Sequence, residues 1–153
     1  KYNETRYEDF VMGTGNAGNY AYGDEVAFPF GYGLSYTSFE YSDMKMSYDE
    51  ATTTYTFQVK VTNTGDMAGT EIVQLYLRDV FSQVTRPVKE LKDFARVELA
   101  AGESKVVEFT VTPDKLMFLD KNMKPIVEPG EFIVMAGSSS ADEDLLKASF
   151  WVK

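Results

Sequence analysis

Apolar and polar residues alternate in short runs from residue 39 to residue 153, which is the pattern of β-strands with one buried face. In residues 53–63 the apolar positions are Tyr55, Phe57, Val59 and Val61, and the residues between them are polar. Turn-forming residues such as glycine, asparagine and proline separate the runs. The pattern predicts strands at residues 39–45, 53–63, 70–80, 91–97, 104–112, 130–137 and 148–152.

The number and spacing of these runs predict the fold class. About seven short strands over residues 37–153 are typical of an all-β, immunoglobulin-like or fibronectin type III-like antiparallel sandwich. No run has the period of an amphipathic helix, except for a single turn at residues 142–147. Residues 1–36 contain six of the eleven glycines and six of the ten tyrosines and follow neither period for long. They are therefore predicted to be an irregular linker or tail ahead of the sandwich.

The run at residues 70–80 breaks the alternation at one position. Val73, Leu75 and Leu77 form the predicted inward face, and Gln74 and Tyr76 belong to the outward face. The exception is Ile72, an apolar residue at an outward position. Four carboxylates that a glycosidase could use are expected instead at ordinary outward strand positions or in loops: Glu71, Asp79, Glu90 and Glu108.

The composition limits the chemistry that the chain can perform. It has no cysteine and no histidine, which excludes disulfides, thiolate nucleophiles and imidazole ligands within these residues. Any reaction would depend on carboxylates, lysine, tyrosine or serine. The formal charge of −9 and the scattered basic residues disfavour nucleic acid and anionic membranes as partners. No apolar run is long enough to span a membrane.

Two short motifs have both a functional and a simpler interpretation. Residues 13–18 match G-x-G-x-x-G, but a dinucleotide site needs a helix directly after the motif, and residues 19–25 do not predict one. Asp142, Glu143 and Asp144 suggest calcium ligands, yet they lack the spacing of an EF-hand loop. The predictions are a flexible loop and a solvated acidic turn, with no metal site and no cofactor.

Aromatic residues are concentrated in residues 28–41, whose sequence is FPFGYGLSYTSFEY. Exposed tyrosine and tryptophan rings can stack on sugars, so Tyr20, Tyr22, Tyr32, Tyr36 and Trp151 would suit a carbohydrate-binding surface. The same ring types bury large apolar areas and dominate protein interfaces. We favour an interface or core role for these rings and keep the sugar platform as the alternative.

Residues 28–39 resemble the segment at which β-glucosidases of glycoside hydrolase family 3 enter their C-terminal domain. Asp93 departs from the family pattern, which usually has glycine there, so we expect the turn at this position to differ slightly. Further matches follow in order and extend the resemblance to about residue 139: Val61-Thr-Asn-Thr-Gly65, Val73-Gln-Leu-Tyr76, Arg86-Pro-Val-Lys-Glu-Leu91, Gly102-Glu-Ser-Lys105 and Glu128-Pro-Gly-Glu-Phe132.

The resemblance implies a fibronectin type III-like domain, in agreement with the strand pattern. Members of the family carry an aspartate nucleophile in a Ser-Asp-Trp-like motif of a barrel, and a glutamate acid/base in a following α/β domain. Neither residue can be placed on any position of this sequence. The chain is therefore expected to have no catalytic residue of its own. It would pack against the barrel and α/β domains of a parent enzyme that hydrolyses terminal β-glycosidic bonds.

The resemblance also implies where the functional residues lie. The interdomain seam is expected at Phe28, Phe30, Tyr32, Leu34 and Tyr36. Four residues of the tail are expected to reach the rim of the sugar site, where an oligosaccharide would contact a loop edge: Asn16, Asn19, Tyr20 and Tyr22.

Two other functions are compatible with the sequence: an autonomous carbohydrate-binding module, and an immunoglobulin-type spacer or adhesion module without a ligand.

Overall fold

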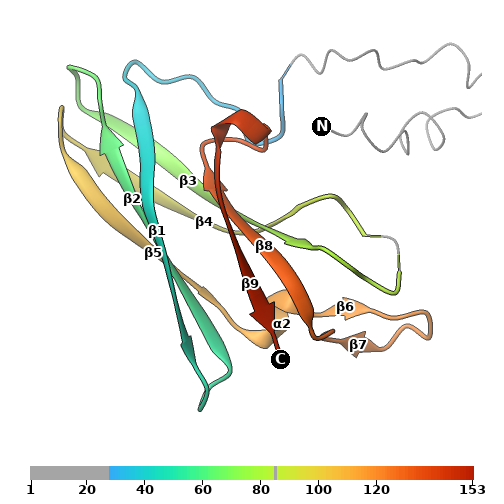
Figure 1. The fold of residues 1–153 in the computed structure, drawn as a ribbon. Helices are drawn as coiled ribbons and strands as arrows, with labels where there is room; N and C mark the ends of the chain where they lie inside the picture. Colours follow the sequence, from blue (N-terminus) through green and yellow to red (C-terminus); the bar gives the residue numbers. More distant parts are fainter. Residues whose placement is uncertain (1–27, 85) are drawn as a thin grey trace, which may run out of the picture.

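The computed structural model describes residues 28–84 and 86–153, which form two antiparallel β-sheets packed face to face (Figure 1). Sheet A has the strand order β1-β2-β5, and sheet B has the order β4-β3-β8-β9. The predicted sandwich of about seven strands is confirmed. The strands are β1 (Phe39–Asp49), β2 (Thr54–Asn63) and β5 (Ser104–Val111) in sheet A, and β4 (Glu90–Leu99), β3 (Gly69–Asp79), β8 (Gly130–Gly137) and β9 (Leu145–Val152) in sheet B.

Short elements connect the strands at the lower and upper ends of the sandwich. Helix α2 (Pro113–Leu116) is a single turn that begins with proline and leads into a hairpin of β6 (Phe118–Leu119) and β7 (Pro125–Ile126). The sequence pattern missed α2, because four residues are too few to produce a helical period. The predicted turn at residues 142–147 is the 3-10 helix η3 (Asp142–Asp144). Among the described residues, no helix has the length and apolar character needed to cross a membrane.

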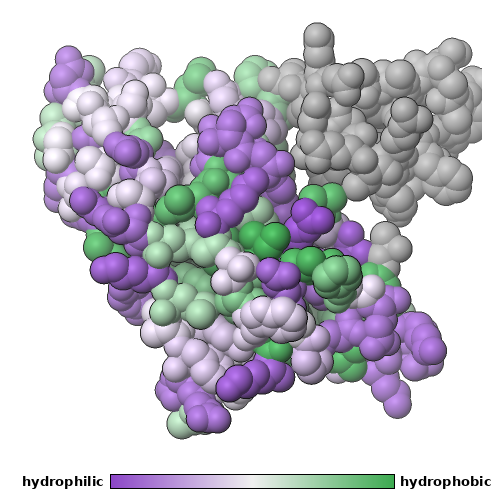
Figure 2. Space-filling model, viewed as in Figure 1, coloured by the Kyte–Doolittle hydropathy of each residue, from purple (hydrophilic) through white to green (hydrophobic). Residues whose placement is uncertain are grey.

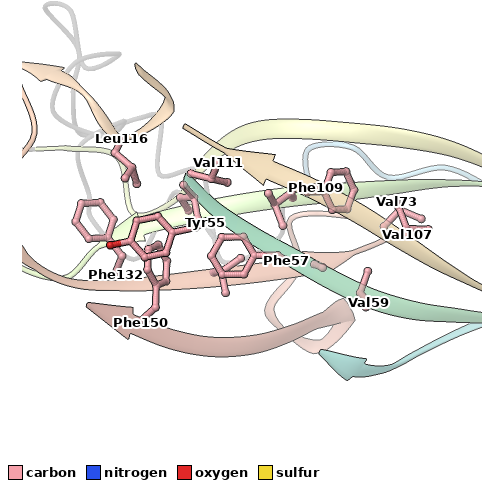
Figure 3. Packing of buried hydrophobic residues seen from close by; sticks show 14 of the residues in the cluster. Tyr55, Phe57, Val59, Val73, Val107, Phe109, Val111, Leu116, Phe132 and Phe150 are labelled. Atoms are coloured by element: carbon pink, nitrogen blue, oxygen red, sulfur yellow. The ribbon is translucent and has the colours of Figure 1, made fainter. Parts of the chain in front are cut away.

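The hydrophobic core lies between the two sheets. On the face that Figure 2 shows, hydrophobic side chains gather midway along β8 and β9, while hydrophilic ones occupy the margins. The larger hydrophobic group is inside, where alternate residues of every long strand meet (Figure 3). On β2 these are the predicted Tyr55, Phe57, Val59 and Val61, and all four are buried.

Phe150 is at the centre of the aromatic part of this core. Its ring centroid lies 5.0 Å from that of Tyr55, 5.1 Å from that of Phe57 and 5.8 Å from that of Phe132. Tyr55 comes from sheet A and Phe132 from sheet B, so Phe150 contacts both layers. The hydroxyl of Tyr55 donates a hydrogen bond to the main-chain carbonyl of Trp151 at 3.1 Å, which satisfies the polar end of this ring.

The sequence predicted the face of Gln74 and Tyr76 on β3 correctly but their exposure wrongly. Both point away from the core, yet both are buried, because other side chains and segments cover this part of sheet B. Tyr76 packs against Met135 and Leu145 in a second, smaller apolar cluster. A period of two residues identifies the face on which a side chain lies, but not what covers that face.

The predicted outward position of Glu71 is wrong. It has the same parity as Val73 on β3, so it points between the sheets and is buried. There the hydroxyl of Tyr41 on β1 donates a hydrogen bond to its Oε1 at 2.5 Å, which joins sheet A to sheet B. Burial raises the pKa of Glu71, the negative charge of Asp144 adds to the increase, and the hydrogen bond from Tyr41 opposes it. Burial and the neighbouring Glu71 also raise the pKa of Tyr41, so Tyr41 stays protonated as the donor.

Replacing Phe150 with alanine should destabilise the domain strongly, because the large cavity would lie between both sheets. We expect a loss of about 3–5 kcal/mol in the free energy of unfolding, measured by urea denaturation. Trp151→Ala is the matched control, since the next side chain along β9 is 69% exposed whereas Phe150 is 3% exposed. That variant should lie within about 0.5 kcal/mol of the wild type. Equal losses in the two variants would contradict the placement of the core.

Replacing Glu71 with glutamine should remove a pH-dependent part of the stability. The pKa of Glu71 in the folded chain is above its ordinary value of 4.5, so protonation favours the folded state. This contribution is fully present below about pH 4.5 and is lost as the pH rises through the folded pKa. Relative to the wild type, Glu71→Gln should therefore gain stability as the pH increases above 4.5. Urea denaturation across this pH range checks the prediction, with Glu108→Gln on the exposed face of sheet A as the control. A stability difference between Glu71→Gln and the wild type that is independent of pH would contradict it.

Candidate functional site

Residues 28–36, which we call the lead-in segment, carry the five predicted seam side chains directly before β1 (blue in Figure 1). The segment contains no strand. Its first part is a turn in which the N–H of Tyr32 donates to the carbonyl of Pro29 at 3.1 Å, and the rings of Phe28 and Tyr32 lie 5.1 Å apart. All five side chains face solvent in the described chain, with exposed fractions from 45 to 95%: Phe28, Phe30, Tyr32, Leu34 and Tyr36.

Gln74 on β3 fixes the first half of the lead-in segment. Its Nε2 donates hydrogen bonds to the carbonyls of Gly31 at 2.9 Å and Ser138 at 2.6 Å, and its Oε1 accepts one from the hydroxyl of Tyr76 at 2.5 Å. Burial raises the pKa of Tyr76 to about 12, so this hydroxyl remains a donor at neutral pH. The three bonds satisfy a buried amide and set its orientation.

Gly31 allows the main chain to approach Gln74 this closely. Its φ is +76°, a conformation that side chains with a Cβ rarely adopt. A Cβ at this position would also overlap Oε1 of Gln74. Two independent constraints, one in the backbone and one from packing, therefore require glycine here.

The loop between β8 and β9 supports the lead-in segment from the other side. The N–H of Ser140 donates to the carbonyl of Phe30 at 2.8 Å, and the ammonium group of Lys89 donates to the carbonyl of Ser140 at 2.8 Å. Lys147 and Lys89 both bind the carboxylate of Asp142, and their hydrogen bonds lower its pKa to about 2. The predicted acidic turn is exposed, and its first residue, Asp142, is ion-paired. In residues 28–84 and 86–153 there is no group of three His, Cys, Asp or Glu side chains suited to a metal.

Asn63 fixes the chain just after the lead-in segment. Its side chain is fully buried; Nδ2 donates to the carbonyls of Met67 at 2.7 Å and Leu99 at 3.2 Å. Its Oδ1 accepts hydrogen bonds from the hydroxyl of Thr37 at 2.6 Å and from the N–H of Gly65 at 3.1 Å. The lead-in segment is thus held near its start by Gln74 and beyond its end by Asn63, while its apolar side chains face outward.

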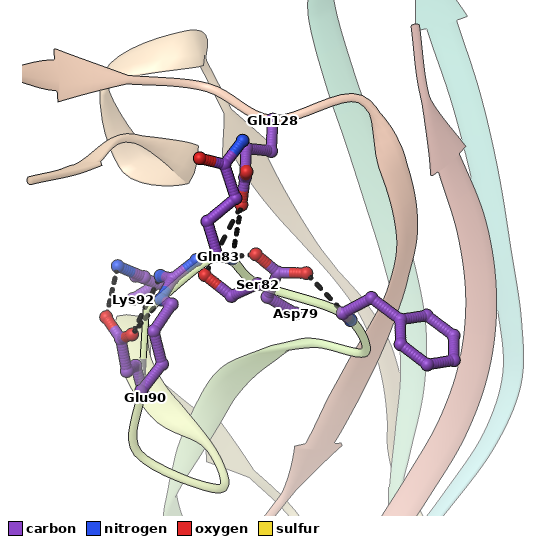
Figure 4. A network of polar contacts seen from close by, with 8 residues as sticks. Asp79, Ser82, Gln83, Glu90, Lys92 and Glu128 are labelled. Carbon is purple, nitrogen blue, oxygen red and sulfur yellow. Dashed lines mark hydrogen bonds and ion pairs between the residues drawn. The ribbon is translucent and has the colours of Figure 1, made fainter. Parts of the chain in front are cut away.

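A network of polar contacts connects the loop after β3 to its surroundings (Figure 4). Arg86 in this loop binds two carboxylates. Its guanidinium group binds Asp79 at 3.0 Å and Glu90 at 2.8 Å, and it stacks over the ring of Phe118 at 4.7 Å. Burial opposes ionisation of Glu90, but hydrogen bonds from Lys92 and Arg86 outweigh it and lower the pKa. The side chain of Asp79 is 2% exposed, so its predicted outward or loop position in solvent is wrong. Both carboxylates serve ion pairs.

The carboxylates singled out in the sequence lie in different surroundings, and Asp79 and Glu90 share the guanidinium group of Arg86. Glu71 and Asp79 are eight residues apart on β3, or about 27 Å, whereas the two carboxyl groups of glycosidases lie roughly 5–9.5 Å apart. Glu103 lines a surface hollow, but the N–H of Ala100 and the ammonium group of Lys105 lower its pKa. A general acid needs the opposite shift.

Of the side chains in the alternative sugar platform, the structure describes Tyr32, Tyr36 and Trp151. Trp151 pairs with Glu131 near the start of β8, whereas the lead-in segment with Tyr32 and Tyr36 meets the end of β8 at Gly137. Glu131 and Gly137 are six positions apart along β8, which corresponds to about 20 Å. Several predicted residues lie outside the described part of the chain: Asn16, Asn19, Tyr20, Tyr22 and the G-x-G-x-x-G motif at residues 13–18.

Sequence reasoning missed the residues that position the lead-in segment. Gln74 and Tyr76 are predicted on the outward face of their strand, and Asn63 is predicted only as the last residue of the run at residues 53–63. The signal was present, because all three occur in the stretches that resemble the family, and a buried amide needs several hydrogen bonds. What the sequence does not show is that two such stretches, around Gly31 and around Gln74, meet in space.

Comparison with known proteins places this geometry in a family. Residues 71–140 match the fibronectin type III-like domain. A β-xylosidase of Formosa agariphila is 44% identical over 148 residues, covering 95% of this chain and 20% of that protein. The β-glucosidase BoGH3A of Bacteroides ovatus is 48% identical over 118 residues, covering 75% of this chain and 16% of that protein. The structure of β-glucosidase 3B from Thermotoga neapolitana in complex with glucose is 36% identical, with a TM-score of 0.77, and covers 97% of this chain and 19% of that one.

The chain therefore spans only 16–20% of the length of these relatives. The part that matches the family runs from β3 to the loop between β8 and β9, which includes Gln74, Lys89 and Ser138. The antiparallel sandwich and the sequence similarity both indicate a fibronectin type III-like domain. The chain belongs to the fibronectin type III-like domains that β-glucosidases and β-xylosidases of glycoside hydrolase family 3 carry as a small part of their length.

Proposed function

We propose that this domain is the non-catalytic C-terminal structural module of a retaining, β-glucosidase-like glycoside hydrolase. The observation that carries the proposal is the lead-in segment, where exposed apolar rings project from a backbone that Gln74 and Asn63 hold in place. Soluble monomers seldom keep contiguous apolar surface in water, and such surfaces mark interfaces. The module would dock these rings on a neighbouring domain and stabilise the geometry of the catalytic unit.

The proposed partners are the catalytic barrel and the α/β domain of the same polypeptide. In the relatives, at least four-fifths of the protein lies outside the matched region, so a large covalent neighbour exists there. The proposed reaction of the parent is hydrolysis of terminal β-glycosidic bonds in oligosaccharides or glycosides. It is supported by the names of the relatives, which are β-glucosidases and β-xylosidases. We also propose, from the family resemblance, that Asn16, Asn19, Tyr20 and Tyr22 reach the rim of the sugar site.

Burial of the lead-in segment would supply a large interaction energy. If docking removed about 500 Å² of apolar surface from water, roughly 25 cal/mol per Å² gives about 12 kcal/mol as an upper figure. Part of this gain would be lost if the segment had to be ordered during docking. The hydrogen bonds at Gly31, Phe30 and Thr37 reduce that loss, because they fix the backbone before a partner arrives.

The isolated chain should not hydrolyse glycosides, because the nucleophile and the acid/base of the family it resembles cannot be placed on its sequence. Assay the purified chain and the full parent protein on aryl β-glucoside and aryl β-xyloside under the same conditions. We expect saturable turnover from the parent and none above background from the chain. Saturable turnover that scales with the concentration of the isolated chain would contradict the proposal.

Gly31→Ala should release the first half of the lead-in segment. The positive φ and the overlap with Gln74 predict a loss of about 1–3 kcal/mol in the free energy of unfolding, together with faster amide exchange at residues 30–33. Gly33→Ala is the matched control two residues away, since nothing lies within 4 Å of a Cβ there. Thermal unfolding and exchange measured on both variants check it. Equal unfolding free energies and equal exchange rates in the two variants would refute the role of Gln74 in holding Gly31.

A further inference from the structure

The outer face of sheet B carries exposed apolar side chains beside the lead-in segment. Ile72 on β3 and Leu91 and Phe94 on β4 are 41%, 37% and 64% exposed. Ile72 is the residue that breaks the alternation in the sequence. In the structure another apolar side chain, that of Phe94, lies on the same face of the adjacent strand.

A β-bulge produces this surface. Residues three apart on a regular strand point to opposite faces, so Leu91 and Phe94 would not share one. Between them the register of β4 shifts by one residue, so that Leu75 pairs with Asp93 but Tyr76 pairs with Leu91. The extra residue turns both apolar side chains outward. The bulge includes Asp93, the position at which the sequence departs from the family pattern.

Two of these side chains lie opposite the residues that hold the lead-in segment. Phe94 pairs with Gln74 across the ladder, and Gln74 holds the carbonyl of Gly31. Leu91 pairs with Tyr76, whose hydroxyl supports Gln74. The outward side chains Leu91 and Phe94 of β4 therefore lie opposite Tyr76 and Gln74, the two residues that position the lead-in segment.

The outer face of sheet A has a different character. Its strands present mainly polar side chains that bind each other across the ladder, as Gln58 does with Glu108 at 2.9 Å and Thr62 with Ser104 at 2.8 Å. Val106 is the exposed apolar residue on this face. One side of the sandwich is thus suited to water, whereas the other carries an apolar row at its edge strand β4, where unpaired backbone groups also need a cover.

We propose that Ile72, Leu91 and Phe94 form a second wall of the docking surface, and that the folded domain preceding this one in the parent polypeptide covers both walls. The inference rests on the proposed function and adds to it the face of the sandwich that is buried. It follows from the position of the lead-in segment, which connects to residues on the N-terminal side, and from the length of the relatives, of which this domain is 16–20%. A neighbour docked on Phe30 and Tyr32 would lie next to Phe94.

The test uses three serine substitutions in the full parent protein and in the isolated chain. Phe94→Ser removes the second wall, and Phe30→Ser removes a ring of the lead-in segment. Val106→Ser is the matched control, because Val106 and Phe94 are both 64% exposed but lie on opposite sheets. The readouts are the melting temperature and the rate of amide exchange at residues 91–96. In the isolated chain, Phe94→Ser and Val106→Ser should leave the melting temperature unchanged.

In the parent, we expect Phe94→Ser and Phe30→Ser to lower the melting temperature and to raise exchange at residues 91–96 several-fold, and Val106→Ser to do neither. An effect of Phe30→Ser without one of Phe94→Ser would overturn the second wall and leave the proposed function standing. Absence of both effects would overturn both proposals. Sedimentation of the isolated chain tests whether a second copy of the chain covers this surface instead. A dimer that Phe94→Ser abolishes would overturn the assignment of the surface to the preceding domain.

Discussion

The buried side-chain amide of Gln74 determines where the lead-in segment lies. It donates to the carbonyls of Gly31 and Ser138 and accepts from Tyr76, so it links the segment before β1, the loop after β8 and the strand β3. If this amide were lost, three polar groups would lose their partner, and the buried hydroxyl of Tyr76 would be costly to leave unpaired. The backbone from which the exposed rings project therefore depends on the side chain of Gln74.

The core and the proposed docking surface are separate in this domain. Alternating apolar residues of the two sheets, with Phe150 among the aromatic rings, form a core that does not include the lead-in segment. The lead-in segment and the outer row of β4 are held by hydrogen bonds and by the bulge, and their apolar side chains remain outside. This division suits a module that folds around its own core and presents a fixed surface to a neighbour.

Most of the fold could be predicted from the sequence, because strands with one buried face repeat every two residues. This holds for β2, where Tyr55, Phe57, Val59 and Val61 are all buried. The same rule failed where a long-range contact decides the outcome: Gln74 and Tyr76 are covered on the outer face, and Glu71 is buried in a hydrogen bond with Tyr41. The shared face of Leu91 and Phe94 could not be predicted either, because a bulge shifts the period.

Side-chain footprinting with hydroxyl radicals tests most directly whether the lead-in segment is a docking surface. The rates of modification at Phe28, Phe30, Tyr32 and Tyr36 would be compared between the isolated chain and the full parent protein, with the exposed Met123 on the hairpin as reference. We predict that the rings react readily in the isolated chain and several-fold more slowly in the parent, while Met123 is unchanged. Equal reactivity of the rings in both proteins would contradict the docking role.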